Sequence, residues 1–469
     1  DVVTAGRVTA VPTALEGLVE KIESFGGWVE DMGQHGLLAV FGREPVEDAP
    51  RRAAHAALAI QRIAALIHPH SEAPRVRIGL HVDNVAIGQI AGVSRVDRAA
   101  KRVAWDQFDA FITRAEPGTV LVSGVTCPFL ERRFVLACGT DGDGATGTVY
   151  RLVGLERTGL GLGERLTPFV ARSRELDQLA RALEQAQTGH GQVVAVVGEP
   201  GVGKSRLFWE FIESCRDRGS QILVASAASY GRQTPYLPVI DLLKAYFRIA
   251  PRDDADKVRE RVQEKVLALE PALAPTLPAL LTLLDVPADD AQWQELDPQQ
   301  KRRQTLEAVK ILLLEHGRRQ PVIAVFEDLH WADSETQAVL DSLVESLPSH
   351  RVLLLVSYRP EYQHAWAPKS YYAQLRLDPL SPEEARAFLD RLMGRAEGMT
   401  ALKTTLIERT EGNPFFLEES VRALVETGVL VGDRGAHRLA RPGGEIQVPA
   451  TVQAILAARI DRLPPEEKA

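Results

Sequence analysis

Hydrophobic residues follow two different patterns along the first third of the chain. VPTALEGLVEKIESF and RRAAHAALAIQRIAALI place apolar residues three or four positions apart, which predicts amphipathic helices. GGWVEDMGQHGLLAVFG has apolar segments around a Gly-Gln-His-Gly turn, which predicts a hairpin. RVRIGLHVDNVAIGQI, TVLVSGVTCPFL and FVLACGTDGDGATGTVYRLVG predict further strands, one of which leads into a short helix. We therefore expect an α+β domain over residues 1–154.

The pattern changes after a glycine-rich, aperiodic segment at residues 155–168, which we interpret as a linker. VVAVV, QILVAS, VIAVF and RVLLLVS are continuous apolar runs separated by helical segments. Strands of this kind are typical of a parallel sheet with helices on both faces, and we expect one over residues 169–378. Three helical segments then occupy residues 379–434, and one more amphipathic helix is predicted within residues 435–469. The expected fold class is α/β.

Composition narrows the class of protein. Hydrophobic residues make up 45% and charged residues 25% of the 469 positions, with a net charge of −8. These values are ordinary for a globular domain, and the acidic balance gives no general attraction to nucleic acid or anionic membranes. No apolar run reaches the roughly 20 residues that span a bilayer. The three cysteines are scattered, which favours reduced thiols and a cytoplasmic location. Because the chain starts at Asp1 and stops at EEKA, we expect a fragment.

The strongest chemical signal is GEPGVGKS, which fits G-x-x-x-x-G-K-[ST] between a predicted strand and a predicted helix. Its glycines let backbone N–H groups turn around phosphate oxygens, and the helix N-terminus adds a positive dipole. The lysine should reach the β- and γ-phosphates, and the serine should hold Mg²⁺. A coincidental glycine turn is the alternative, which the strand and helix context opposes. The predicted residues for ATP and Mg²⁺ are Gly198, Gly201, Gly203, Lys204, Ser205 and Arg206.

Acidic and basic residues end the next two predicted strands. VIAVF delivers Glu327 and Asp328 to its carboxyl end, where open α/β sheets bind ligands. We assign the metal-linked role to Glu327 and water activation to Asp328, although the sequence also permits the reverse. Asp333 is explained equally well as the N-cap of the following helix. RVLLLVS ends near Arg359, which either senses the γ-phosphate or is a surface cation.

These motifs, with SYRPEY and EGNPFFLEE, resemble the STAND class of AAA-related signalling ATPases over residues 166–469. The resemblance implies that residues 379–434 form a lid whose GxP motif brings Pro414 to the adenine. It also implies that PFVARSREL borders the adenine at Val170, although Ala171 and Ser173 stand where the family has Gly and Glu. VPATVQAILAARIDRLPPEEKA resembles the start of the family's winged-helix element, here at residues 435–469. Helical repeats that commonly follow are absent.

The N-terminal phrases resemble, in order, a class III nucleotidyl cyclase homology domain, a family with a ferredoxin-like fold. The resemblance implies two metal-binding aspartates, one in a first strand that we expect to precede residue 1. The second would lie in the hairpin turn, where Gln34 and His35 stand instead. Imidazole is a poor substitute for the hard oxygen ligands that Mg²⁺ prefers. The family's transition-state Asn and Arg also have no clear match near residues 93–118. We interpret the domain as a degenerate cyclase.

The leading hypothesis is a slow signalling ATPase in which ATP and Mg²⁺ control a lid and its protein partners, with a pseudo-cyclase as regulatory module. One alternative is an active adenylate cyclase regulated by the ATPase. Another is a transcription regulator whose DNA-binding part lies outside this sequence. Expected partners are ATP or ADP and proteins that contact the lid or the missing C-terminal repeats. The resemblances also imply a homodimer or higher oligomer, and we expect neither a membrane nor a nucleic acid as partner.

Overall fold

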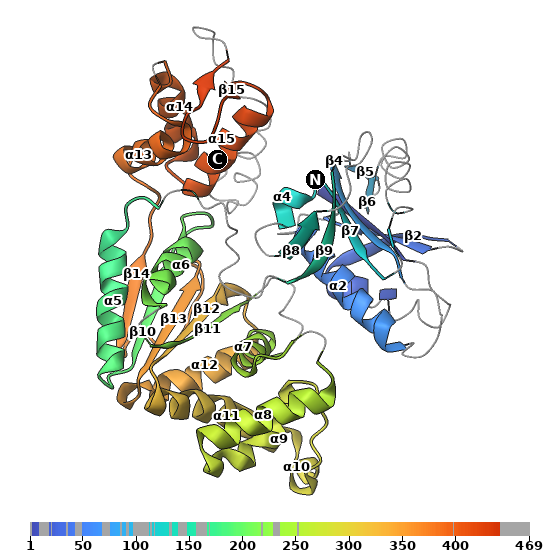
Figure 1. The fold of residues 1–469 in the computed structure, drawn as a ribbon, viewed down its shortest axis with the longest axis vertical. Coiled ribbons are helices and arrows are strands. Elements are labelled where there is room, and N and C mark those ends of the chain that lie inside the picture. The colour runs from blue at the N-terminus through green and yellow to red at the C-terminus, as the bar shows by residue number, and fades with distance from the viewer. Residues whose placement is uncertain are drawn as a thin grey trace. The chain divides into compact units, whose positions relative to one another are not determined.

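The computed structural model separates the chain into two compact units, residues 1–164 and 165–469, each described here by itself (Figure 1). Within the described residues, no helix has the length and hydropathy needed to cross a membrane. The residues that the structure describes are 2–8, 18–19, 21–33, 36–42, 49–67, 76–84, 87–90, 93–96, 112, 115–116, 118–130, 134–138, 148–155, 167, 169–216, 219–227, 235–250, 253–396 and 398–440. The predicted linker therefore lies mostly outside them.

The N-terminal unit is built on a seven-stranded sheet of order β2-β3-β1-β4-β7-β9-β8. Helix α2 packs on one face of the sheet, where its alanines allow close approach to apolar residues of β3, β4 and β7. β5 and β6 form a separate antiparallel pair. The bounds are β1 Val2–Val8, β2 Gly27–Gly33, β3 Gly36–Phe41, α2 Ala49–Ile67, β4 Ile78–Asn84, β5 Ile87–Ile90, β6 Val93–Val96, β7 Val120–Ser123, α4 Cys127–Leu130, β8 Phe134–Cys138 and β9 Val149–Leu155.

Strand β1 lies in the interior of the sheet, between β3 and β4. That a metal-binding first strand of the resembled family precedes residue 1 stays a prediction. Its last residue, Val8, pairs with Leu37 at the start of β3. The predicted hairpin is present, with Gly33 paired to Gly36, while Gln34 and His35 lie outside the described residues. The end of β1 is thus next to the turn that the cyclase resemblance marks as a metal turn.

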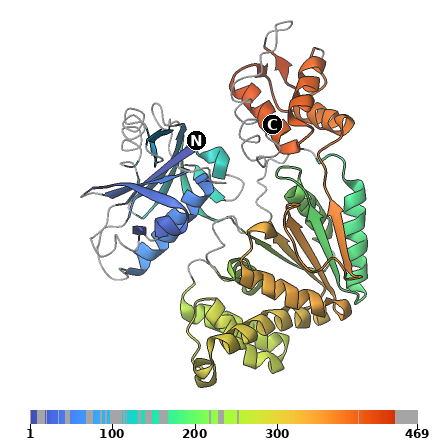
Figure 2. The same ribbon diagram turned by 180° about the vertical axis from the view of Figure 1, so that it is seen from behind.

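The C-terminal unit contains a five-stranded parallel sheet of order β11-β12-β13-β10-β14. Residues of β12 and β13 are buried throughout, because helices cover both faces (Figures 1 and 2). Helix α5 packs against β10 and β13. This sheet confirms the predicted α/β class. The strands are β10 Gln192–Val197, β11 Gln221–Ser226, β12 Val322–Glu327, β13 Val352–Tyr358 and β14 Tyr372–Arg376, and the first two helices are α5 Ser173–Gln187 and α6 Lys204–Cys215.

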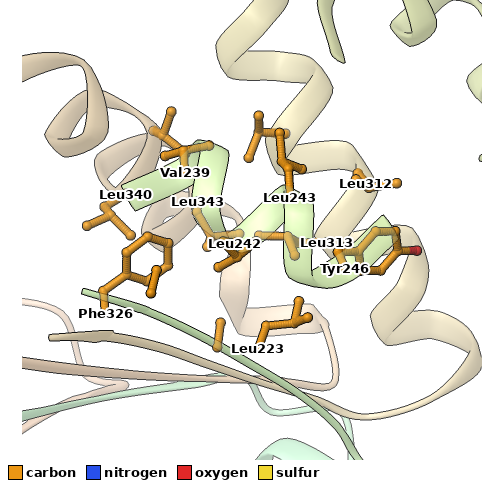
Figure 3. Packing of buried hydrophobic residues seen from close by; sticks show 14 of the residues in the cluster. Leu223, Val239, Leu242, Leu243, Tyr246, Leu312, Leu313, Phe326, Leu340 and Leu343 are labelled. Carbon is orange, nitrogen blue, oxygen red and sulfur yellow. The ribbon is translucent and has the colours of Figure 1, made fainter. Parts of the chain in front are cut away.

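The largest core of this unit lies between the sheet and three helices, α7, α11 and α12. Figure 3 shows Leu223 and Phe326 of the sheet facing Leu242 of α7, with leucines of α11 and α12 around them. Leu223, Phe326 and Leu242 are each at most 2% exposed, so water does not reach this part of the core. The helical elements between β11 and β13 are α7 Leu237–Phe247, α8 Ala255–Leu269, η2 Pro271–Thr276, α9 Leu277–Leu283, α10 Ala291–Glu295, α11 Pro298–Arg319, η3 Leu329–Trp331, α12 Ser334–Ser346 and η4 Leu347–Ser349.

Three helices after β14 enclose a smaller core of their own. They are α13 Pro382–Met393, α14 Thr400–Thr410 and α15 Pro414–Glu426, and they are followed by the paired strands β15 Leu430–Val431 and β16 Arg438–Leu439. The backbone N–H groups of Gly435 and His437 donate to carbonyl groups of Leu392 and Met393 in α13. The helical lid, as we name residues 379–439, therefore extends past residue 434. The predicted winged-helix segment lies largely outside the described residues.

Candidate functional site

The glycine loop joins β10 to α6 at the carboxyl edge of the parallel sheet. Gly203 caps α6 with a φ of 101°, and Gly201 has a φ of 85°. Both values lie in the left-handed region that side chains disfavour, which explains why the loop needs glycine at these positions. The first helical turn starts with Lys204 and Ser205, so unpaired N–H groups and the positive end of the helix dipole face the loop. The arrangement is suited to binding an anion.

Lys204 folds back over this loop. Its Nζ donates to the carbonyl oxygens of Gly198 at 2.6 Å and Glu199 at 3.0 Å, and the residue is only 8% exposed. Burial lowers the pKa of the Lys204 ammonium below its ordinary value. The charges of Asp328 and Glu327 oppose that shift, whereas Arg359 reinforces it. β13 pairs with β10 on one side and with β12 on the other, so the glycine loop, the two acids and Arg359 all follow neighbouring strands at one edge of the sheet.

The two predicted acids occupy different environments at the end of β12. Glu327 is its last residue and is fully buried, while Asp328 is partly exposed. Asp328 has a φ of 56° and a ψ of 44°, which turns the chain sharply after the strand. Ser205, Glu327 and Asp328 carry the hard oxygen atoms that Mg²⁺ prefers as ligands. Among the described residues there is no group of three or more His, Cys, Asp or Glu able to hold a metal by itself.

Ser357 is a site residue that the sequence analysis did not identify. It is 1% exposed on β13, and its Oγ accepts a hydrogen bond from the backbone N–H of Asp328 at 3.0 Å. The bond holds the left-handed turn that directs the Asp328 side chain. In the sequence, a serine two positions before Arg359 does not by itself indicate a functional role. Its bond to the N–H of Asp328 can be recognised only once β12 and β13 are known to be neighbours.

Arg359 follows β13 and is partly buried. Its guanidinium carbon lies 5.6 Å from the ring centroid of Trp331, within cation–π range. Trp331 comes from η3, directly after the two acids. Together with its effect on the pKa of Lys204, this contact places Arg359 at the same sheet edge as the glycine loop.

In the region predicted to border the adenine, Arg206 packs against two aromatic rings. The Arg206 guanidinium lies 5.7 Å from the ring centroid of Phe169 and 5.2 Å from that of Trp209, and it pairs with Glu210. Val170 packs against the lid core. Ala171, which stands where the resembled family has Gly, has a φ of 60° and so occupies a conformation that glycine adopts more easily.

The lid contacts the glycine loop directly. Pro414 is the first residue of α15, and the preceding Asn413 caps this helix by accepting from the N–H of Phe415. Asn413 Nδ2 also donates to the Pro200 carbonyl oxygen at 3.0 Å, across 213 residues of sequence. A Cβ atom added to Gly201 would lie 2.7 Å from Asn413 Oδ1, so the lid leaves no room for a side chain there. The sequence analysis did not identify Asn413 as a site residue.

Four residues outside this centre are joined by hydrogen bonds. Asp333 accepts from backbone N–H groups at the start of α12, as expected of an N-cap, and also from the N–H of Tyr236. The Tyr236 hydroxyl donates to Glu335, which also accepts from Arg302. Arg302 lies near the start of α11 and is exposed.

An aromatic network supports the end of β13 that leads to Arg359. His364 Nδ1 accepts the N–H of Trp366 at 3.1 Å, so the neutral ring carries its proton on Nε2. Nε2 lies 2.7 Å from the Tyr358 hydroxyl and 3.2 Å from that of Tyr372. The two hydroxyls are 2.7 Å apart. Burial raises the pKa of Tyr358 and lowers that of His364, while the charge of Asp341 opposes the shift of His364.

This network predicts a loss of stability in mild acid. The folded-state pKa of His364 lies below the unfolded value of 6.5, so the unfolded chain binds the proton first. The stability that the neutral His364 ring contributes to the folded state is fully present above pH 6.5. It is lost as the pH falls through the lower folded-state pKa of His364. Thermal unfolding of the wild type and of His364→Gln between pH 7.5 and 5.5 measures how much His364 contributes to the pH dependence of stability. We expect a steeper decline for the wild type, and equal slopes would contradict the assignment.

Comparison with known proteins supports the nucleotide-binding half of the site. Residues 168–356 match the family described as the AAA ATPase domain, a class of nucleotide-binding domains. The match includes the glycine loop and both acids, whereas Arg359 and the lid lie beyond it. An uncharacterized protein of Rhizobium meliloti (strain 1021) is 27% identical over 260 residues. The aligned region is 54% of this chain and 24% of that protein, so the chain spans about a quarter of its relative.

Solved structures similar to this chain include two nucleotide cyclases. One is the catalytic core of a rhodopsin-guanylyl cyclase with converted specificity, in complex with ATPalphaS, at 15% identity over 33% of this chain and 95% of that chain, with a TM-score of 0.28. The other is the adenylyl cyclase CyaB from P. aeruginosa, at 12% identity over 33% of this chain and 95% of that chain, with a TM-score of 0.27. At these identities the likeness concerns the fold and says nothing of activity.

Proposed function

We propose that the chain is a STAND-type signalling ATPase in which binding and slow hydrolysis of Mg-ATP control the lid and, through it, a protein partner. One observation carries the proposal. The glycine loop with Lys204, the two acids and Arg359 follow three neighbouring parallel strands, β10, β12 and β13, and so meet at the carboxyl edge of one sheet. Open α/β sheets bind ligands at this edge.

Each residue has a role that its environment supports. Lys204 and the glycine loop bind the β- and γ-phosphates, while Ser205 and Glu327 hold the Mg²⁺ that the nucleotide brings. Asp328 accepts a proton from water as the water oxygen bonds to the γ-phosphorus and the bond to the β-phosphate oxygen breaks. ADP and phosphate leave. Arg359 stabilises the charge on the γ-phosphoryl group, and Trp331 holds its guanidinium in place.

The lid supplies the signalling output in this proposal. Its contacts with Pro200 and Gly201 join it to the loop that binds the phosphates. A nucleotide that binds more tightly to one arrangement of this contact increases the fraction of molecules in that arrangement. The size of the increase is set by the difference between its affinities for the two arrangements. Because such a switch works through populations, turnover should lie below the 1–10³ s⁻¹ typical of metabolic enzymes.

Binding and turnover of the whole chain test the ATPase proposal. We expect saturable binding of Mg-ATP by calorimetry and slow release of inorganic phosphate. A chain that is folded by circular dichroism but binds no Mg-ATP at millimolar concentration would contradict the proposal. Binding without any phosphate release would restrict it to a non-hydrolysing switch.

The N-terminal unit acts as a regulatory module without cyclase activity in this proposal. The support comes from β1, whose seven residues include no Asp or Glu, beside a hairpin turn that also has no carboxylate in its sequence. Two-metal catalysis needs carboxylates at such positions. Incubation with Mg-ATP or Mn-ATP, followed by chromatography for cyclic AMP, should yield none. Formation of cyclic AMP would replace this part of the proposal with the cyclase alternative.

A further inference from the structure

Asn413 lies between the lid and the glycine loop and serves both. It is 4% exposed, so its amide is almost completely removed from water. The Oδ1 atom accepts the N–H of Phe415 at 3.1 Å and thereby caps α15. The Nδ2 atom donates to the Pro200 carbonyl oxygen at 3.0 Å. The Phe415 N–H also lies 3.3 Å from the Gly201 carbonyl oxygen. Two successive carbonyl groups of the glycine loop are therefore bonded to the lid.

These bonds fix the direction of two N–H groups in the loop. A trans peptide group is planar, and its C=O and N–H point to opposite sides of the chain. When the Pro200 carbonyl faces Asn413, the N–H of Gly201 must point away from the lid. When the Gly201 carbonyl faces Phe415, the N–H of Val202 points away as well, and this group lies 3.5 Å from the Glu199 carbonyl oxygen within the loop.

We propose that Asn413 is a positioning residue for phosphate binding: its amide orients the glycine loop so that the Gly201 N–H faces the nucleotide. This inference rests on the proposed function, because it assumes that the loop binds phosphate. It goes further by making nucleotide affinity depend on a lid residue that does not itself contact the phosphates. It also explains why the position carries Asn, since capping alone is served equally well by Asp or Ser.

The two roles of Asn413 can be separated by substitution. Asn413→Ser and Asn413→Asp both keep a side-chain oxygen that caps α15, but both lose the Nδ2 donor to Pro200. Serine is uncharged and too short to reach that carbonyl, while aspartate places a carboxylate against it. Ser381→Ala is the matched control, because Ser381 caps α13 of the same lid by accepting the N–H of Glu384.

Affinity for Mg-ATP, thermal stability and amide exchange of residues 198–204 should be measured for the full chain of each variant. We expect both Asn413 variants to bind about tenfold more weakly, which corresponds to about 1.4 kcal/mol, and to exchange faster in the loop without nucleotide. Ser381→Ala should lower the melting temperature without either effect. The inference fails if Asn413→Ser binds and exchanges as the wild type does, if only Asn413→Asp weakens binding, or if Ser381→Ala weakens it equally.

The exchange measurement separates this inference from the proposed function. If the wild type binds no Mg-ATP, the proposed function fails. Unchanged exchange in the glycine loop of Asn413→Ser would then refute the positioning role independently, whereas faster exchange would show that Asn413 orders the loop.

Discussion

Replacing Lys204 by alanine should weaken Mg-ATP binding by about two orders of magnitude and leave the fold intact. Hydrogen bonds to charged groups contribute about 1.5–3 kcal/mol each, and every 1.4 kcal/mol is tenfold in affinity. Lys204 is buried, and its Nζ donates to two uncharged carbonyl oxygens of the loop, those of Gly198 and Glu199. A triphosphate would offer this ammonium far stronger acceptors, so much of its interaction energy is available for binding.

Two further variants isolate the charge. Lys204→Met keeps the length of the side chain without the ammonium, and it should lose as much affinity as the alanine variant. Lys310→Ala removes a partly buried lysine that pairs with Glu307 within α11, and this variant should bind Mg-ATP normally. Calorimetric titration with Mg-ATP and a melting curve for each variant give the comparison. Unaltered binding by a folded Lys204→Ala chain would mean that the glycine loop is not the phosphate site.

The sequence was most informative where chemistry requires a fixed local pattern. GEPGVGKS specifies its loop because the left-handed φ values at Gly201 and Gly203 and the following helix are local properties. The continuous apolar runs specified β10, β12 and β13 because strands covered on both faces need apolar residues throughout. These features predicted both the class of the fold and the edge at which the candidate site lies.

Features that depend on distant partners were not visible in the sequence. β14 was missed because it is an edge strand with mostly exposed residues and lacks an apolar run. Ser357 was missed because its partner, the N–H of Asp328, belongs to a neighbouring strand end. Asn413 was assigned no role, because its bond to Pro200 spans 213 residues. In each case the residue type was compatible with several roles, and tertiary pairing selects one.

Substitution of the two acids at the end of β12 should reduce turnover much more than binding. Loss of a general base typically costs 10²–10⁴-fold in rate, and we expect Asp328→Asn to fall in that range. Asparagine is a suitable replacement because it tolerates the left-handed backbone that Asp328 adopts. Glu327→Gln preserves shape in a fully buried position while removing the charge that would face Mg²⁺. Its turnover should fall comparably, with a stronger requirement for added magnesium.

Phosphate release and Mg-ATP affinity, measured side by side, distinguish a catalytic loss from a binding loss. Asp333→Asn is the control, since Asp333 lies on the same segment but caps α12, a task that asparagine performs equally well. That variant should keep both turnover and stability near the wild-type values. If Asp328→Asn and Glu327→Gln also retain full turnover, the water-activating group lies elsewhere at this sheet edge. A rate loss confined to Glu327→Gln would reverse the two roles, because the buried acid would then be the one that activates water.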